Sequence, residues 1–259
     1  MEFKTVIYAT RNRVATILLN RPKAMNAFET QLRLDLRAAI RQAELADEVR
    51  VIIISGAGRG FSAGADLQHG IEPYDTIEAQ ILAEYKPFLM AIHNSPKLFI
   101  SAVNGPCAGI ATALAMVCDL TVMADDAYLY QAFAAIGLVP DGGASWHLVH
   151  ALGYKRALQA LVECEKITAR DCLELGLANH VVAADELRPF TQSWAEKLAA
   201  GSPLAQRYTK ELLRKATRLD LPEIIDLEAK AQITTSTSRD ALHAVEAFFK
   251  KEKPRFEGR

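Results

Sequence analysis

The sequence predicts an α/β fold, and three patterns in the chain lead to this prediction. Short β-branched apolar runs, such as residues 51–54, have the length and composition of buried strands. Segments between them carry apolar residues at helical spacing. Residues 98–118 contain no charged side chain, but the turn-forming Asn104-Gly105-Pro106 divides them into a strand, a turn and an Ala-rich helix.

The same reasoning places each element along the chain. Strands are expected at residues 14–20, 51–55, 98–104, 120–123 and 128–130. Helices are expected at about 110–118 and at 29–47, where Leu32, Leu36, Ile40 and Leu45 would form an apolar stripe. From about residue 202 the chain is helical, polar and rich in Lys and Arg, with amphipathic runs at 204–216 and 224–233. That region cannot close a core by itself.

Length and composition limit the classes of function. A chain of 259 residues with 50% apolar residues can bury one large core. Its 30 basic and 31 acidic residues give a formal net charge of −1, so we expect neither a nucleic acid nor an anionic membrane as partner. The four cysteines form no Cys-x-x-Cys pair and the six histidines show no zinc-ligand spacing, so no metal is expected. The first residues lack an apolar signal core, and we predict a cytoplasmic protein.

Two turns are the candidate functional elements: one joins the strand at 98–104 to the helix near 110, and the other joins the strand at 51–55 to a glycine-rich loop. The first N–H groups of a helix beginning near residue 110 have no partner within it and can hold an anion or an oxyanion. The second turn follows residues 51–54 and carries four glycines in nine residues, at positions 56, 58, 60 and 64. Its spacing fits neither a dinucleotide fingerprint nor a P-loop, so it indicates another use of exposed backbone.

These turns, with other segments in the same order and spacing, resemble the crotonase superfamily, the enoyl-CoA hydratase and isomerase family. The matching segments are Asn20-Arg-Pro-Lys-Ala-Met-Asn-Ala27, Gly58-Arg-Gly-Phe-Ser-Ala-Gly-Ala-Asp-Leu67, Ala102-Val-Asn-Gly105 with Cys118-Asp119, and Ile136-Gly-Leu-Val-Pro-Asp-Gly-Gly143. The resemblance covers nearly the whole chain. It implies a spiral of repeated β-β-α units at residues 1–200, carrying an acyl-CoA site, and a C-terminal helical trimerisation region at 201–259.

The resemblance implies that a thioester carbonyl becomes an enolate held by two backbone N–H groups. The donors would be those of Ala65 and Ile110, with Gly109 one register away as the alternative. Loss of one such donor costs about a hundredfold or more in rate. Substrate contacts are expected from residues that match the family's binding positions: Lys23, Ala24, Ala63, Ala65, Asp66, Leu67, Gly109, Ile110, Phe133 and Lys253. Coenzyme A would be part of the substrate, with no separate cofactor.

The two glutamates of family hydratases are absent from this sequence. Their positions align with Ala113 and Phe133, and neither side chain can exchange a proton. The remaining acid is Asp141, which resembles the acid used by superfamily members without both glutamates, including isomerases similar to 1,2-epoxyphenylacetyl-CoA isomerase. Phe133, Ile136 and Leu138 would shield this acid and raise its pKa. Since Pro-Asp-Gly is also a common turn, Asp141 could instead be only a turn former.

Three other residues have alternatives that the sequence leaves open. Asp66 could shape the CoA pocket or cap a helix beginning at Leu67. His147 is read as a surface or packing residue in a helix, and Cys107 as buried. The segment 72–85 is expected to border the acyl pocket, with Tyr74, Glu84 and Tyr85 as unassigned polar residues.

The preferred function is therefore an enoyl-CoA double-bond isomerase with Asp141 as acid and base. A hydratase with a non-standard acid, a non-catalytic acyl-CoA binder and an RNA-binding superfamily member stay open as alternatives. A dehalogenase is disfavoured, because Phe133 lacks the hydrogen-bond donor that the related subgroup has there. The resemblance also implies trimers or hexamers, with Lys253 reaching the CoA.

Overall fold

The computed structural model describes residues 2–259 and confirms the α/β class, with two sheets. The larger sheet has six strands, and the smaller sheet has three. In the larger sheet the strands lie in the order β1 (Val6–Arg11), β2 (Val14–Leu19), β3 (Val51–Gly56), β4 (Leu98–Val103), β6 (Leu120–Ala124) and β9 (His180–Val182). β1 pairs antiparallel with β2, whereas the neighbours from β2 to β9 are parallel. The smaller sheet consists of β5 (Pro106–Ala108), β7 (Tyr128–Tyr130) and β8 (Lys166–Thr168).

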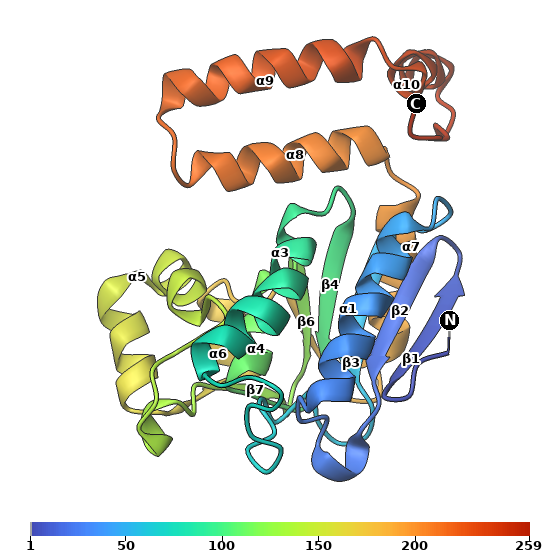
Figure 1. The fold of residues 1–259 in the computed structure, drawn as a ribbon. Coiled ribbons are helices and arrows are strands. Elements are labelled where there is room, and N and C mark those ends of the chain that lie inside the picture. The colour runs from blue at the N-terminus through green and yellow to red at the C-terminus, as the bar shows by residue number, and fades with distance from the viewer. Residues whose placement is uncertain (1) are drawn as a thin grey trace.

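Helices cover both faces of the larger sheet. Figure 1 shows α1 (Thr30–Leu45) and α3 (Lys86–Asn94) in front of it and α7 (Leu187–Ala199) behind it. All six residues of β3 are buried, as a parallel strand between two helical layers requires. The apolar stripe of α1 buries Leu32, Leu36 and Ile40 as predicted, but Leu45 is 71% exposed. The buried stripe continues at Ala43, three residues after Ile40. Leu45 comes five residues after Ile40, which places it on another face of the helix.

The uncharged run at residues 98–118 divides into three elements. It forms β4, the short β5 and α4 (Ile110–Val117), so the predicted division at Asn104-Gly105-Pro106 is correct. β5 has only three residues and was not predicted. Within residues 2–259, no helix has both the length and the apolar character that a membrane crossing requires.

The remaining elements connect strands within each sheet or, in the case of α6, link the smaller sheet to the larger one. They are the 3₁₀ turns η1 (Pro22–Ala24) and η3 (Ala134–Ile136), α2 (Ile77–Gln80), the π-helical turn η2 (Ile81–Tyr85), α5 (Ala144–Val162) and α6 (Ala169–Glu174). Gly153 has a non-helical backbone and interrupts α5. The segment 72–85, read from sequence as a loop, is helical from residue 77 onward.

Three C-terminal helices extend beyond the sheets. They are α8 (Pro203–Ala216), α9 (Leu221–Ser236) and α10 (Arg239–Lys250), and Figure 1 shows α9 beyond α8, away from the larger sheet. The link at residues 200–202 falls where the sequence places a boundary between two regions, and that division stays a prediction.

One carboxylate ties α8 to the sheet. Asp119 accepts hydrogen bonds from Lys210 Nζ at 2.8 Å, from Arg214 Nη2 at 2.7 Å and from the Phe99 N–H at 2.9 Å. The Lys210 side chain is 6% exposed, so its charge depends on Asp119 for compensation.

We expect Asp119→Ala to lower the free energy of unfolding by about 3 kcal/mol, since it leaves the buried Lys210 charge unpaired. Denaturant titration of the folded protein measures this change. The control is Glu174→Ala, which removes an exposed partner of Arg170 and should cost less than about 0.5 kcal/mol. Equal small losses in both variants would contradict the anchoring role of Asp119.

Candidate active site

Two turns at the carboxyl ends of β3 and β4 are joined by backbone hydrogen bonds. The Phe61 N–H donates to the Pro106 carbonyl at 3.0 Å, and the Ala108 N–H donates to the Ser62 carbonyl at 2.9 Å. This pairing places the glycine-rich turn beside the start of α4. Ligands of open parallel sheets commonly bind at this edge.

Two asparagine side chains hold the glycine-rich turn in shape. Asn26 is fully buried, and its Nδ2 donates to the carbonyls of Ala57 at 2.9 Å and Gly60 at 3.0 Å. Asn104 accepts from the Gly56 N–H at 3.1 Å and donates to the Gly58 carbonyl at 3.0 Å. Both residues lie within the segments that resemble the family, Asn26 in residues 20–27 and Asn104 in residues 102–105, but the sequence alone assigned neither a role in holding this turn.

Gly64 allows the two turns to touch. A Cβ at this position would lie 2.6 Å from the Ala108 carbonyl oxygen, and the residue has φ +88°. Both features exclude an ordinary side chain there. The peptide that leads into Ala65 therefore lies against the backbone just before Ile110.

The N–H groups of Ala65 and Ile110 have no hydrogen-bond partner among residues 2–259. Ile110 is the first residue of α4, where an N–H has no intrahelical acceptor. The Gly109 N–H instead donates to the Tyr130 carbonyl at 3.0 Å. Of the two registers left open by the sequence, Ile110 is the one with a free donor.

Asp141 lies in a turn packed against α4. A Cβ at the next residue, Gly142, would be 2.2 Å from Ile110 Cδ1 and 2.9 Å from Ala113 Cβ, and Gly142 has φ +60°. The turn that carries the acid thus lies against the residue with the free donor and against one of the two positions where hydratases have a glutamate.

Burial controls the charge of Asp141. Its Oδ1 is buried without a hydrogen-bond partner, and loss of solvent raises the pKa of the carboxyl to about 6. The predicted direction of this shift is confirmed, but its predicted cause is partly wrong. Phe133 is 7% exposed, whereas Ile136 and Leu138 are 54% and 44% exposed and do not enclose the acid.

The other carboxylates near these turns are held by arginines. Arg21 Nη1 donates to Asp66 at 3.0 Å, and Arg33 Nε donates to Glu84. Although burial opposes it, the hydrogen bond from Arg21 lowers the pKa of Asp66. Among these acids, Asp141 is the one with an unpaired oxygen and a pKa near neutrality.

Asp66 does not cap a helix. Residues 67–70 form turns, and its Oδ1 accepts only from the Gln68 N–H at 3.2 Å. The prediction of a helix start at Leu67 is wrong because the chain there continues into a loop before α2. Leu67 itself is 70% exposed.

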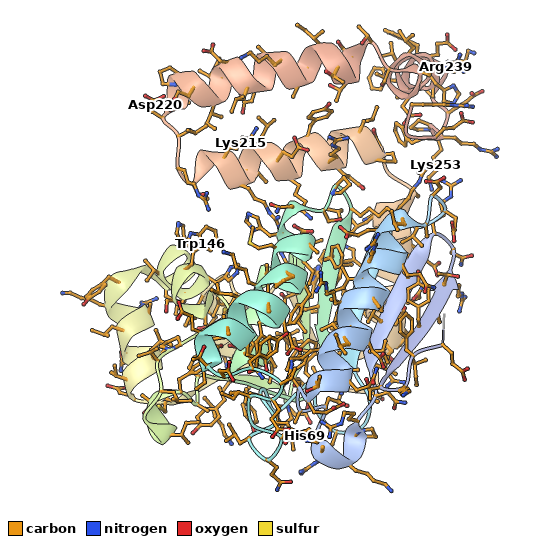
Figure 2. All side chains as sticks on the ribbon, in the orientation of Figure 1. His69, Trp146, Lys215, Asp220, Arg239 and Lys253 are labelled. Atoms are coloured by element: carbon orange, nitrogen blue, oxygen red, sulfur yellow. The ribbon has the colours of Figure 1, made fainter. Side chains whose placement is uncertain are left out.

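Most other predicted residues lie around the same turns. Lys23 and Ala24 belong to η1. The Ala63 N–H donates at 2.8 Å to the carbonyl of Met25, the residue just after η1. Phe133 reaches toward Gly109, with its Cζ 4.0 Å from the position of a Cβ there. Lys253 lies elsewhere: Figure 2 shows it beside the C-terminal helices, on the opposite side of the molecule from His69, which is in the loop that follows Asp66.

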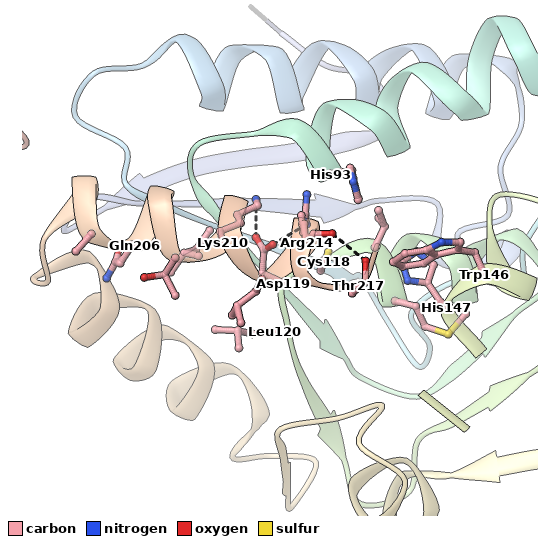
Figure 3. Close-up of a pocket in the computed structure, with 16 residues that line it drawn as sticks. His93, Cys118, Asp119, Leu120, Trp146, His147, Gln206, Lys210, Arg214 and Thr217 are labelled. Carbon is pink, nitrogen blue, oxygen red and sulfur yellow. Dashed lines mark hydrogen bonds and ion pairs between the residues drawn. The ribbon is translucent and has the colours of Figure 1, made fainter. Parts of the chain in front are cut away.

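A cavity of about 550 Å³ lies outside this arrangement. Figure 3 shows it between α8 and the sheet, lined by residues that include His93, Asp119, His147 and Arg214, and by none of the predicted site residues. Burial lowers the pKa of His147 to about 4, with smaller effects from His93 and Arg214. His147 is therefore a neutral packing residue in α5, and Cys107 is fully buried, as predicted.

Residues 9–259 match the family described as enoyl-CoA hydratase/isomerase. The chain belongs to this family. It is 34% identical to a probable enoyl-CoA hydratase of Rhodobacter capsulatus and 31% identical to the 1,2-epoxyphenylacetyl-CoA isomerase of Escherichia coli, each time with both chains fully covered. The enoyl-CoA hydratase subunit I structure of Geobacillus kaustophilus is 32% identical, superposes with a TM-score of 0.93 and is also fully covered.

The predicted resemblance and the crotonase type of fold are thereby confirmed. Hydratase and isomerase relatives match at similar identity, so similarity alone does not choose between the two reactions. For this member of the enoyl-CoA hydratase/isomerase family, the choice depends on the residues at the site.

Proposed function

We propose that the protein is an enoyl-CoA double-bond isomerase in which Asp141 moves the proton. The observation that supports this most is a buried, unpaired acid with a pKa of about 6, carried on a turn that packs against the side chain of Ile110, whose N–H is free. Ala113 and Phe133 meanwhile occupy the hydratase glutamate positions. The substrate would be an acyl-CoA thioester, and no cofactor is needed beyond its coenzyme A.

The reaction is a proton transfer with no net change in atoms. The Asp141 carboxylate removes a proton from C2 of a 3-enoyl-CoA, and the electron pair moves into a dienolate. The N–H groups of Ala65 and Ile110 would stabilise the charge on its oxygen. Protonated Asp141 then delivers the proton to C4, which gives the 2-enoyl-CoA. One carboxyl group is sufficient for both transfers.

Hydration is the second candidate, because relatives named as hydratases are as similar as the isomerase. Hydration by the family route uses two carboxyl groups, one for hydroxide and one for the proton. Asp66 and Glu84 are both bound to arginines, so neither is free to act with Asp141 as the second carboxyl group. A non-catalytic acyl-CoA binder would not need the raised pKa of Asp141.

We expect Asp141→Asn to lose isomerisation of 3-enoyl-CoA by about 10² to 10⁴-fold while it keeps acyl-CoA binding. A base must be ionised, so wild-type kcat/KM should fall as the pH drops through about 6, the pKa of Asp141. Steady-state assays with 3-enoyl-CoA and 2-enoyl-CoA across this range test both points. Hydration of 2-enoyl-CoA by wild type, or unchanged isomerisation in the variant, would overturn the proposal.

The role of the Ile110 N–H is tested by a pair of substitutions. Ile110→Pro removes the donor at a helix position where Pro is tolerated, and should lower kcat by about 10² to 10³-fold. Ile110→Ala removes more of the buried side chain but keeps the N–H, so its kcat should stay much closer to wild type. Equal losses of kcat in two folded variants would assign the effect to packing instead.

We also propose that the protein self-associates as a trimer or hexamer. The C-terminal helices expose large apolar side chains, among them Ile233, Leu242, Phe248 and Phe249, at 60% to 78% of their surface. Such a surface is more typical of an interface than of a monomer. Figure 2 shows Lys253 beside the C-terminal helices and away from His69, four residues after Ala65, so its proposed contact with CoA would be made in the site of a neighbouring copy.

Light scattering of the purified protein should give three or six times the chain mass of 28.4 kDa. Replacing Phe248 and Phe249 together by Asp should reduce this mass toward one chain, because two exposed aromatic rings leave the interface. Leu45→Asp, on the 71% exposed end of α1, is the matched control and should leave the mass unchanged. A wild-type monomer would contradict the assembly.

A further inference from the structure

Tyr85 is a buried residue that the proposed reaction leaves without a role. Its side chain is 2% exposed, yet its hydroxyl has no hydrogen-bond partner among the described residues. Buried polar atoms are almost always hydrogen-bonded, so an unpaired buried hydroxyl indicates that a partner is missing from the free protein. Tyr85 ends η2, and short π-helical turns are frequent at functional sites.

The packing places Tyr85 between the two parts of the site. On one side its ring meets Phe28 edge-on at 6.3 Å, and the Phe28 N–H donates to the Gly64 carbonyl at 2.8 Å, next to Ala65. On the other side Leu89 lies one helical turn further along, and its Cδ1 is 3.3 Å from the position of a Cβ on Gly142. Tyr85, which immediately precedes α3, therefore lies one turn before a residue of α3 that touches the Asp141 turn.

Arg33 fixes the position of Tyr85. Its guanidinium pairs with the neighbouring Glu84, donates to the Phe28 carbonyl at 2.8 Å and lies 5.6 Å from the centre of the Tyr85 ring. The Arg33 and Glu84 side chains are 2% and 7% exposed. A hydroxyl held by such a frame loses little conformational freedom when it forms a hydrogen bond.

The two unpartnered atoms are complementary. Tyr85 carries a donor without an acceptor, and Asp141 Oδ1 is an acceptor without a donor. Burial raises the pKa of Tyr85 to about 12 although the nearby Arg33 guanidinium opposes the rise, and the charges of Asp141 and Glu84 add smaller increases, so the hydroxyl keeps its proton near neutrality. Each group supplies what the other lacks.

We propose that Tyr85 is a positioning residue whose hydroxyl donates a hydrogen bond to the Asp141 carboxylate when an acyl-CoA occupies the site. The bond would hold the carboxylate in one orientation while it takes and returns the proton. This inference rests on the proposed role of Asp141 as acid and base.

The charged groups on the elements around Asp141 do not contribute to its raised pKa, which comes from loss of solvent. On α3 they include the exposed Lys86. On α1 and η2 these are Arg33 and Glu84, which bind each other, and on α5 it is His147, which burial keeps neutral. Across the site, Arg21 is bound to Asp66. Residues 131–140 and α4 carry no charged side chain. We therefore expect removal of the Tyr85 hydroxyl to change the titration of Asp141 in the complex with an acyl-CoA and not in the free protein.

The test is Tyr85→Phe, with Tyr8→Phe as the matched control, because the Tyr8 hydroxyl is also buried and unpartnered but lies on β1. The carboxyl band of Asp141 is followed by infrared spectroscopy against pH in the complex with octanoyl-CoA, a saturated thioester that cannot isomerise. Asp141→Asn identifies the band. We expect Tyr85→Phe to raise the midpoint by about one pH unit, because the ionised carboxylate loses a donor.

Kinetics give a second readout. In Tyr85→Phe the acidic limb of kcat should move to higher pH, while kcat/KM, which reports the free enzyme, keeps its profile. An unmoved carboxyl midpoint, or a uniform loss of rate without a shift of the limb, would overturn the positioning role. If the midpoint shifts but wild type isomerises no enoyl-CoA, the positioning stands and the proposed reaction fails.

Discussion

The close contact between the turns after β3 and β4 is the constraint on which the site depends. Three backbone hydrogen bonds join residues 61–62 to 106–108, and Gly64 lies so near the Ala108 carbonyl that a methyl group would collide with it. The contact brings the Ala65 N–H and the first N–H of α4 to one place. Since both donors belong to the backbone, their positions follow from the fold and not from any side-chain choice.

Burial has opposite consequences for the donors and for the acid. Water-free surroundings strengthen the attraction between N–H groups and a developing enolate. The same surroundings penalise the charged form of Asp141, whose Oδ1 has no partner in the free protein. Burial of the ionised acid costs free energy, but it also brings the pKa of the acid close to the value that a catalytic base needs near neutral pH. A donor such as Tyr85, engaged only in the complex, would limit that cost at the moment of reaction.

The sequence predicted the parts of this arrangement that depend on local pattern. The turns, the start of α4 at Ile110 and the burial of Cys107 follow from Gly/Pro positions and apolar runs. The contact of Tyr85 with Phe28, and that of Gly142 with Ala113, join segments far apart in the chain, and no periodicity encodes them. For the same reason Ile136 and Leu138, close to Asp141 in sequence, were wrongly expected to shield it, whereas α4 provides the packing.

The packing also bears on the absence of a family glutamate at position 113. Ala113 lies beneath Gly142 with so little room that even a Cβ on Gly142 would come within 2.9 Å. A glutamate at 113 would compete for the space that the Asp141 turn now fills. Within the proposed function, the small residue at 113 and the close approach of the Asp141 turn to α4 are two parts of one arrangement, which fits a one-acid proton transfer.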